Sequence, residues 1–165
     1  SILERLHGVG IPVYAVGKIE DIFAHRGIGH SDHTGNNLAS QKTVERFAAE
    51  MKRGFLFANF IDFDMLYGHR RDPKGYAECL VQTDQWLASF LPTLSANDTL
   101  FITADHGNDP TFKGTDHTRE IVPLLVYQPG HKGVSLGLRN GYFDIAQSVA
   151  SQFGLDPMPR GVAFL

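Results

Sequence analysis

The stretch FLFANFI at residues 55–61 is a nearly continuous apolar run of strand length. A strand that is covered on both faces, as in a parallel sheet, has this pattern. The run passes directly into DFDMLYGH at residues 62–69, where carboxylate and imidazole side chains appear. The stretch therefore predicts a buried strand with polar chemistry at its carboxyl end.

Strand and helix patterns alternate on both sides of this run. Strands are also expected at residues 11–16, 98–103 and 121–127, which are rich in apolar and β-branched side chains. The last two have no crossover helix between them, so we expect them to be antiparallel neighbours. The whole pattern predicts an α/β fold in a single domain over residues 1–165, with a mostly parallel sheet and helices on its faces.

Capping residues and periodicity predict the helices. Ser40 is the expected N-cap of one helix, and Asp72 with Pro73 at the first helical position predicts the start of the next. An amphipathic segment at residues 144–153 predicts a third helix. Residues 26–37 are rich in Gly, Asn, Asp and His without a period of either kind, and we expect a loop there.

Composition excludes several classes of protein. Lys and Arg number 15 against 18 Asp and Glu, and the net charge of −3 gives no basic surface for nucleic acid or membrane. No apolar run approaches the roughly 20 residues of a membrane span. The single cysteine, Cys79, cannot form an internal disulfide, which favours a cytoplasmic location. No base lies beside Cys79 in the sequence, so an inert thiol is expected.

Three clusters of Asp and His are expected in loops rather than on apolar faces: two at the exits of the strands at 55–61 and 98–103, and one at the far end of the loop that follows the second strand. The carboxyl ends of strands in an open α/β sheet share one edge, so these side chains are expected to meet there as the long loop at residues 104–119 folds back. Carboxylate with neutral imidazole suits Mn²⁺, Zn²⁺ or Fe²⁺ better than Mg²⁺ or Ca²⁺. Five ligands exceed a single zinc site and indicate a two-metal centre. The expected ligands are Asp64, His69, Asp105, His106 and His117, with Asp116 outside the set.

Each cluster also has a purely structural interpretation. Asp64 could cap the turn that follows it, and residues 105–108 could form an ordinary polar turn. Arg70 and Arg71 could bind a phosphate through their guanidinium groups or pair with a neighbouring carboxylate. Taken together, at two strand ends with a linking loop, the clusters favour a metal site over separate turns.

Three motifs carry a resemblance to a known family: DFDMLYGHRRD at residues 62–72, TADHGND at 103–109 and GTDHTRE at 114–120. Together they resemble phosphopentomutase of the alkaline phosphatase superfamily, whose core is similar to that of cofactor-independent phosphoglycerate mutase. The segment VGKIEDIF at residues 16–23 resembles the stretch that returns from the family's cap domain. The resemblance covers almost the whole chain and implies the C-terminal part of a three-layer alkaline-phosphatase-like core.

Carried over residue by residue, the resemblance implies one manganese ion held by Asp64, His69 and His117, and a second held in part by Asp105 and His106. The family's nucleophilic threonine, its remaining aspartate ligand and its cap domain have no counterpart in these 165 residues. The implied reaction is phosphoryl transfer on a pentose phosphate, which interconverts ribose 1-phosphate and ribose 5-phosphate or the deoxyribose pair. By itself the 165-residue chain is expected to be inactive as a mutase.

Two other functions stay open. One is that of a relative with another substrate, either a phosphoglycerate mutase or a metal-dependent phosphatase, although the run YGHRRD at residues 67–72 favours phosphopentomutase. The other is a non-catalytic metal-binding fragment. A chain that lacks part of its sheet would expose a strand edge, so self-association is also expected.

Overall fold

The computed structural model describes residues 1–165 in full, and its contacts group them into two compact units. No helix combines the length and the apolar character that crossing a membrane requires. A single domain over the whole chain stays a prediction. Unit 1 comprises Ser1–Gly35, Lys42–Asn59 and Gly133–Leu165, and unit 2 comprises Asn36–Gln41 and Phe60–Lys132.

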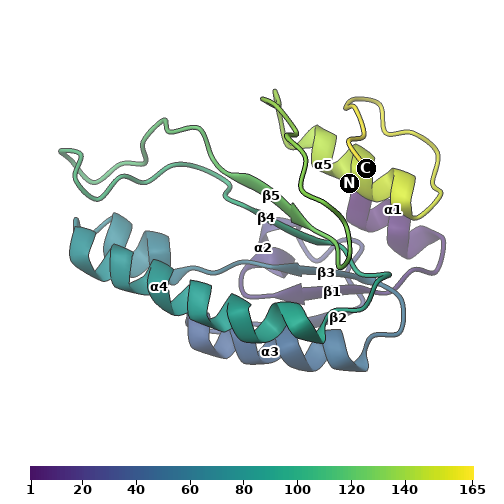
Figure 1. The fold of residues 1–165 in the computed structure, drawn as a ribbon, viewed down its shortest axis with the longest axis horizontal. Coiled ribbons are helices and arrows are strands. Elements are labelled where there is room, and N and C mark those ends of the chain that lie inside the picture. The colour runs from purple at the N-terminus through teal and green to yellow at the C-terminus, as the bar shows by residue number, and fades with distance from the viewer. The chain divides into compact units, whose positions relative to one another are not determined.

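Unit 1 is built on a three-stranded parallel sheet in the order β2-β1-β3 (Figure 1). The central strand is paired on both edges and carries three fully buried side chains. The parallel pairing confirms the α/β prediction, whereas the expected loop at residues 26–37 contains a strand of three residues, too short to show a period. The strands are β1 (Val13–Val16), β2 (His30–Asp32) and β3 (Phe55–Ala58).

Helices α1 (Ile2–Gly8), α2 (Ile19–Ile22) and α5 (Phe143–Gln152) belong to the same unit. Helix α1 lies against α5, and both α1 and α2 contact β1 (Figure 1). Leu3 and Leu6 of α1 are fully buried and form part of the apolar core. The helix predicted at residues 144–153 is thus confirmed within one residue at each end.

Helix α3 (Asn37–Glu50) starts earlier than its sequence suggests. The Asn36 side chain accepts a hydrogen bond from the Ala39 backbone N–H at 2.8 Å, which is the role of an N-cap. The Ser40 hydroxyl instead donates to the Asn36 carbonyl at 3.0 Å from within the first turn. The expectation that Ser40 caps this helix is therefore wrong, because an Asn four residues upstream satisfies the free N–H groups first.

Unit 2 contains a pair of strands. It also contains two helical segments that lie on either side of the Asp72-Pro73 step. Asp72 accepts the Gly75 N–H at 2.9 Å, which confirms the predicted helix start. The two strands pair antiparallel, with Thr103 opposite Leu124, as expected from the absence of a crossover helix between them. The elements are the π-helix η1 (Phe63–Gly68), α4 (Pro73–Phe90), the 3₁₀-helix η2 (Leu91–Thr93), β4 (Leu100–Thr103) and β5 (Leu124–Tyr127).

Gly17 ends β1 where the backbone of Asn59 passes close by. Its φ is +76°, and a Cβ at this position would lie 2.6 Å from the Asn59 carbonyl oxygen. Gly10 has nearly the same φ, +78°, but open space around it. The two glycines therefore separate the cost of the backbone conformation from the cost of the clash.

We expect Gly17→Ala to lower the free energy of unfolding more than Gly10→Ala does. A left-handed φ costs an alanine about 1 kcal/mol at either position. Displacing the Asn59 carbonyl adds about 1–3 kcal/mol at Gly17 alone. Urea denaturation of both variants measures the difference, and equal losses would contradict the close approach.

Cys79 on α4 is buried, and the Asn37 side-chain amide donates to its sulfur at 3.4 Å. Burial raises the pKa of the thiol, with a smaller opposing effect from the Asn37 hydrogen bond and a further rise from the Asp62 carboxylate. The thiolate fraction at pH 8 is therefore smaller than that of an exposed cysteine. This environment agrees with the inert thiol expected from the sequence.

At pH 8 the thiol of Cys79 should react with an aromatic disulfide at least roughly 100-fold more slowly in the native chain than in urea, because both thiolate formation and access are suppressed. Since its pKa is raised, the native rate should keep increasing with pH after the rate in urea has levelled off. The absorbance of the released thiol measures both rates. Equal native and denatured rates would contradict the buried environment.

Candidate metal centre

Asp64 lies on the π-helix η1 and His69 directly follows its last residue, where the sequence suggests a loop. The His69 backbone N–H donates to the Asp64 carbonyl at 2.9 Å, a hydrogen bond across five residues. In an α-helix these residues would point about 140° apart. The wider turn places them together, with His69 Nε2 3.3 Å from Asp64 Oδ2. Such π-turns recur at functional sites.

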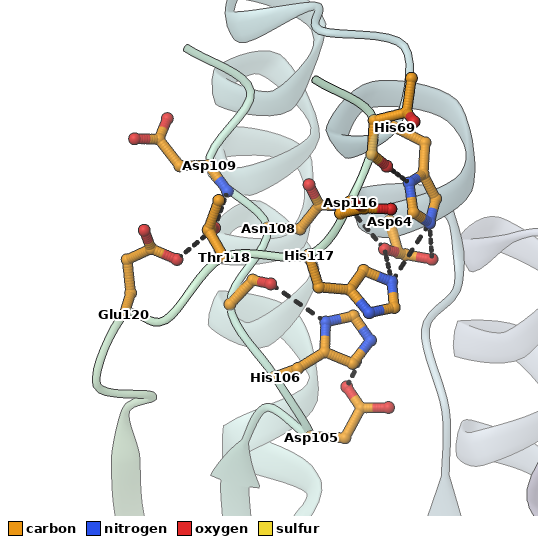
Figure 2. Close-up of polar contacts among 12 residues, drawn as sticks. Asp64, His69, Asp105, His106, Asn108, Asp109, Asp116, His117, Thr118 and Glu120 are labelled. Carbon is orange, nitrogen blue, oxygen red and sulfur yellow. Dashed lines mark hydrogen bonds and ion pairs between the residues drawn. The ribbon is translucent and has the colours of Figure 1, made fainter. Parts of the chain in front are cut away.

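His117 reaches the same place from the far end of the loop that follows β4, as expected. The Thr118 N–H donates to the Gly107 carbonyl at 3.0 Å and closes this loop at its base. The imidazole of His117 then lies with Nε2 3.2 Å from His69 Nε2 and 3.4 Å from Asp64 Oδ1 (Figure 2). Donor atoms of three side chains thus converge from two segments far apart in the sequence.

His106 and Asp105 complete the cluster. The His106 ring stacks on that of His117 with centroids 3.7 Å apart, and its Nε2 lies 3.7 Å from Asp105 Oδ1 (Figure 2). One ligand atom from each of Asp64, His106 and His117 lies within 4.8 Å of the others. The Asp105 side chain is 68% exposed. The five side chains expected as ligands therefore all lie in one cluster of unit 2, and Asp105 is the most exposed of them.

Backbone carbonyls fix the protonation pattern of two of the imidazoles. His69 Nδ1 lies 2.6 Å from the Thr115 carbonyl, and His106 Nδ1 lies 3.2 Å from the Gly107 carbonyl. A carbonyl oxygen can only accept a hydrogen bond, so each Nδ1 carries a hydrogen, and in the neutral ring Nε2 is the nitrogen with the free lone pair. Metal-binding histidines are oriented by this kind of outer contact.

The donor set fits a divalent ion. The Nε2 atoms of His69 and His117 lie 3.2 Å apart, and they lie 3.3 and 3.4 Å from the two different oxygens of the Asp64 carboxylate. Donors that share an ion at about 2.1 Å are separated by about 3.0–3.4 Å in octahedral or tetrahedral geometry. Mixed carboxylate and imidazole donors suit Mn²⁺, Zn²⁺ or Fe²⁺. The three side chains could hold such an ion with little rearrangement.

The sequence did not point to Arg71 as an organiser of the site. Its guanidinium donates to the backbone carbonyls of Gly114, of Asp109 at 2.8 Å and of Asp116 at 2.8 Å, and to Asn108 Oδ1 at 3.0 Å. The structure therefore gives Arg71 backbone carbonyls and a side-chain amide as hydrogen-bond partners, in place of the neighbouring carboxylate considered from the sequence. No pattern in the sequence marks backbone carbonyls as its partners.

Asn108 was also missed as a site residue. It is buried, and its amide Nδ2 donates to Asp64 Oδ1 at 2.6 Å. Gly68 passes so close to this amide that a Cβ there would overlap it. The glycine before His69 in the first motif is thus explained by the side chain of a residue forty positions later.

Two titratable groups near the cluster, Asp109 and Tyr76, have shifted pKa values. Backbone and hydroxyl hydrogen bonds from Thr111 lower the pKa of Asp109, with help from the charge of Arg71. Burial raises the pKa of Tyr76 on α4, and the Asp64 and Glu120 carboxylates add to the effect. Asp109 therefore stays ionised and Tyr76 stays protonated near neutral pH.

Comparison with known proteins gives this cluster its context. Residues 9–157 match the family described as the metalloenzyme superfamily. The chain belongs to that superfamily. The match includes all five Asp and His residues of the cluster.

Phosphopentomutases are similar to this chain along its whole length. The chain is 52% identical over 167 residues to the phosphopentomutase of Caldanaerobacter subterraneus subsp. tengcongensis and 49% identical over 166 residues to that of Herpetosiphon aurantiacus. Each alignment covers 100% of this chain and 42% of the relative. The chain is therefore a phosphopentomutase homologue that spans about two fifths of the length of these relatives, which confirms the resemblance carried by the three motifs.

A solved structure of Leishmania mexicana phosphoglycerate mutase shares the fold. The TM-score is 0.73 at 18% sequence identity, and the match covers 98% of this chain and 38% of that one. At this identity the likeness concerns the fold alone. It confirms the α/β prediction and the core similarity to phosphoglycerate mutase.

The close approach of Gly68 to Asn108 predicts a steric defect in Gly68→Ala. The added methyl must displace the amide that holds Asp64, so the free energy of unfolding should fall by about 1–3 kcal/mol. Gly35 has open space around it, and Gly35→Ala serves as the control. Urea denaturation compares the two variants, and a neutral Gly68→Ala would contradict the tight contact.

Proposed function

We propose that this chain holds divalent metal ions that serve phosphoryl transfer on a pentose phosphate. The observation that carries the proposal is the convergence of Asp64, His69 and His117 donor atoms at 3.2–3.4 Å, with His69 Nδ1 tied to a backbone carbonyl. Membership of the metalloenzyme superfamily supports the same chemistry.

The two expected ion sites differ in completeness. Asp64, His69 and His117 offer three converging donors for one Mn²⁺ ion. Asp105 and His106 offer two donors for a second ion, and Asp105 is largely exposed. Fewer donors and more contact with water should weaken the second site.

Two bound ions would stabilise the attacking and leaving oxygens of a phosphoryl displacement. The residues of the chain supply orientation: carbonyls hold the imidazoles of His69 and His106, and Asn108 holds the carboxylate of Asp64. The hydroxyls of Thr111 and Thr118 donate to Asp109 and Glu120, so they are poor candidates for the nucleophile. We propose that this chain provides most metal ligands and no nucleophile.

The substrate assignment follows from the relatives. We propose interconversion of ribose 1-phosphate and ribose 5-phosphate, or the deoxyribose pair, by a family-length protein that includes these residues, and no mutase activity of the 165 residues alone. Identities of 49–52% to phosphopentomutases favour this over a phosphoglycerate mutase, which is supported only by fold at 18% identity. A cytoplasmic location and self-association through a sheet edge stay part of the proposal.

Titration with Mn²⁺ alone tests the metal proposal on the 165-residue chain. We expect a tight and a weak event in calorimetry. Asp64→Asn should weaken the tight event by roughly 100-fold or more, because losing a direct ligand should cost at least as much as losing an outer contact. Asp116→Asn is the matched control, since it removes a neighbouring carboxylate outside the ligand set. No binding would overturn the proposal, and equal affinities would contradict the order of the two sites.

A chimera tests the substrate. The corresponding segment of the Caldanaerobacter relative is replaced by residues 1–165 of this chain, and conversion of ribose 1-phosphate is assayed. Activity that Asp64→Asn abolishes supports the pentose phosphate assignment. Conversion of phosphoglycerates instead would favour the alternative substrate, and metal binding without either activity would favour the non-catalytic interpretation.

A further inference from the structure

We infer that Arg71 and Asn108 form a positioning pair that sets the Asp64 carboxylate and the His117 imidazole for one metal ion. The inference rests on the metal binding proposed above. It assigns to both residues a role in the geometry of the ligands rather than contact with a substrate.

The guanidinium of Arg71 fixes the loop that carries His117. Its Nε donates to the Gly114 carbonyl, one terminal nitrogen donates to the Asp109 carbonyl at 2.8 Å, and the other donates to the Asp116 carbonyl at 2.8 Å. The Asp116 carbonyl belongs to the peptide bond that leads into His117. Holding both flanks of the loop therefore fixes the backbone from which the His117 side chain extends.

His69 strengthens this arrangement from the ligand side. Its Nδ1 lies 2.6 Å from the Thr115 carbonyl, the peptide group between those that Arg71 holds at Gly114 and Asp116. Three successive carbonyls of the loop are thus held by two residues of one short segment. The loop is placed by the same segment that supplies a ligand, so His117 and His69 are set relative to each other.

Asn108 links the Arg71 guanidinium to the Asp64 carboxylate through its side-chain amide. Its Oδ1 accepts from Arg71 at 3.0 Å, which leaves Nδ2 to donate to Asp64 Oδ1 at 2.6 Å. An isolated amide could flip, but a guanidinium can only donate, so Arg71 dictates which end of the amide faces Asp64. Burial of Asn108 and the close backbone of Gly68 restrict the amide further. The orientation of Asp64 therefore depends on Arg71 through Asn108.

The donor inventory argues against substrate binding by Arg71. A guanidinium has five N–H donors, and four hydrogen bonds to protein acceptors occupy most of them. A bidentate grip on phosphate needs two free parallel donors. The neighbouring Arg70 is exposed and makes none of these contacts, so it provides a matched control.

The experiment compares Arg71→Lys, Asn108→Ala and their double variant with Arg70→Lys in the 165-residue chain. Lysine keeps the charge but presents its donors from a single nitrogen and cannot span separated carbonyls. Mn²⁺ affinity is measured by calorimetry, the number of coordinated imidazole nitrogens by pulsed electron paramagnetic resonance, and the stability of the metal-free chain by urea denaturation.

We expect each single variant to weaken the tight Mn²⁺ site by roughly 10–100-fold, the usual effect of losing an outer contact. The double variant should lose little more than the worse single one, because both changes break the same connection. Arg71→Lys should also lose one coordinated imidazole nitrogen, that of His117, whereas Arg70→Lys should match the wild type in every measurement.

The outcomes separate this inference from the function on which it rests. Absence of Mn²⁺ binding by the wild-type chain removes the proposed function and the inference with it. Normal binding by the wild type and by Arg71→Lys overturns the inference alone, as do equal losses in Arg70→Lys or additive losses in the double variant. If Arg71→Lys does not fold, Asn108→Ala decides: unchanged affinity and imidazole coordination overturn the inference, and weakened affinity in a folded chain supports it.

Discussion

The hydrogen bond from the Asn108 amide to the Asp64 carboxylate is the contact on which the proposed metal centre depends. It joins the π-helical turn to the loop after β4, two segments separated by more than forty residues. A buried amide can make this bond only if nothing occupies the space beside it, which requires Gly68. The amide oxygen of Asn108 also needs a hydrogen-bond donor, and the Arg71 guanidinium supplies it. Gly68 and Arg71, which belong to the same short segment, therefore both determine the orientation of the Asn108 amide.

Backbone carbonyls perform most of the remaining organisation. Those of Thr115 and Gly107 accept from imidazoles, and those of Gly114 and Asp116 accept from Arg71. An irregular loop leaves such carbonyls without partners in a helix or sheet, so they can accept hydrogen bonds from side chains. The absence of regular structure in this loop thus supplies the acceptors that orient the ligands, and the Gly107–Thr118 bridge keeps its ends together.

The parts that could be predicted depend on local physics. The apolar run at residues 55–61 indicates a strand, which forms over Phe55–Ala58 with half-buried rather than buried side chains. Asp72 with Pro73 indicates a helix start because both residues act on the first turn alone. Strand β2 was missed because three residues show no period, and its pairing with β1 exists only once the sheet forms. The cap at Asn36 was missed because two polar residues competed for one role.

Residue types alone indicate the chemistry of the site: carboxylates and imidazoles beside strand ends, in motifs specific enough to indicate the family. Which of these side chains meet depends on how the folded chain brings the segments together. Asp64 and His69 face each other because the backbone closes a five-residue turn there, and His117 joins them because Arg71 holds the loop from which it extends. The kind of ligand atom that a residue offers depends on that residue alone, so the sequence reveals it. Ligand geometry depends on hydrogen bonds between distant backbone and side-chain groups, which exist only after the chain has folded.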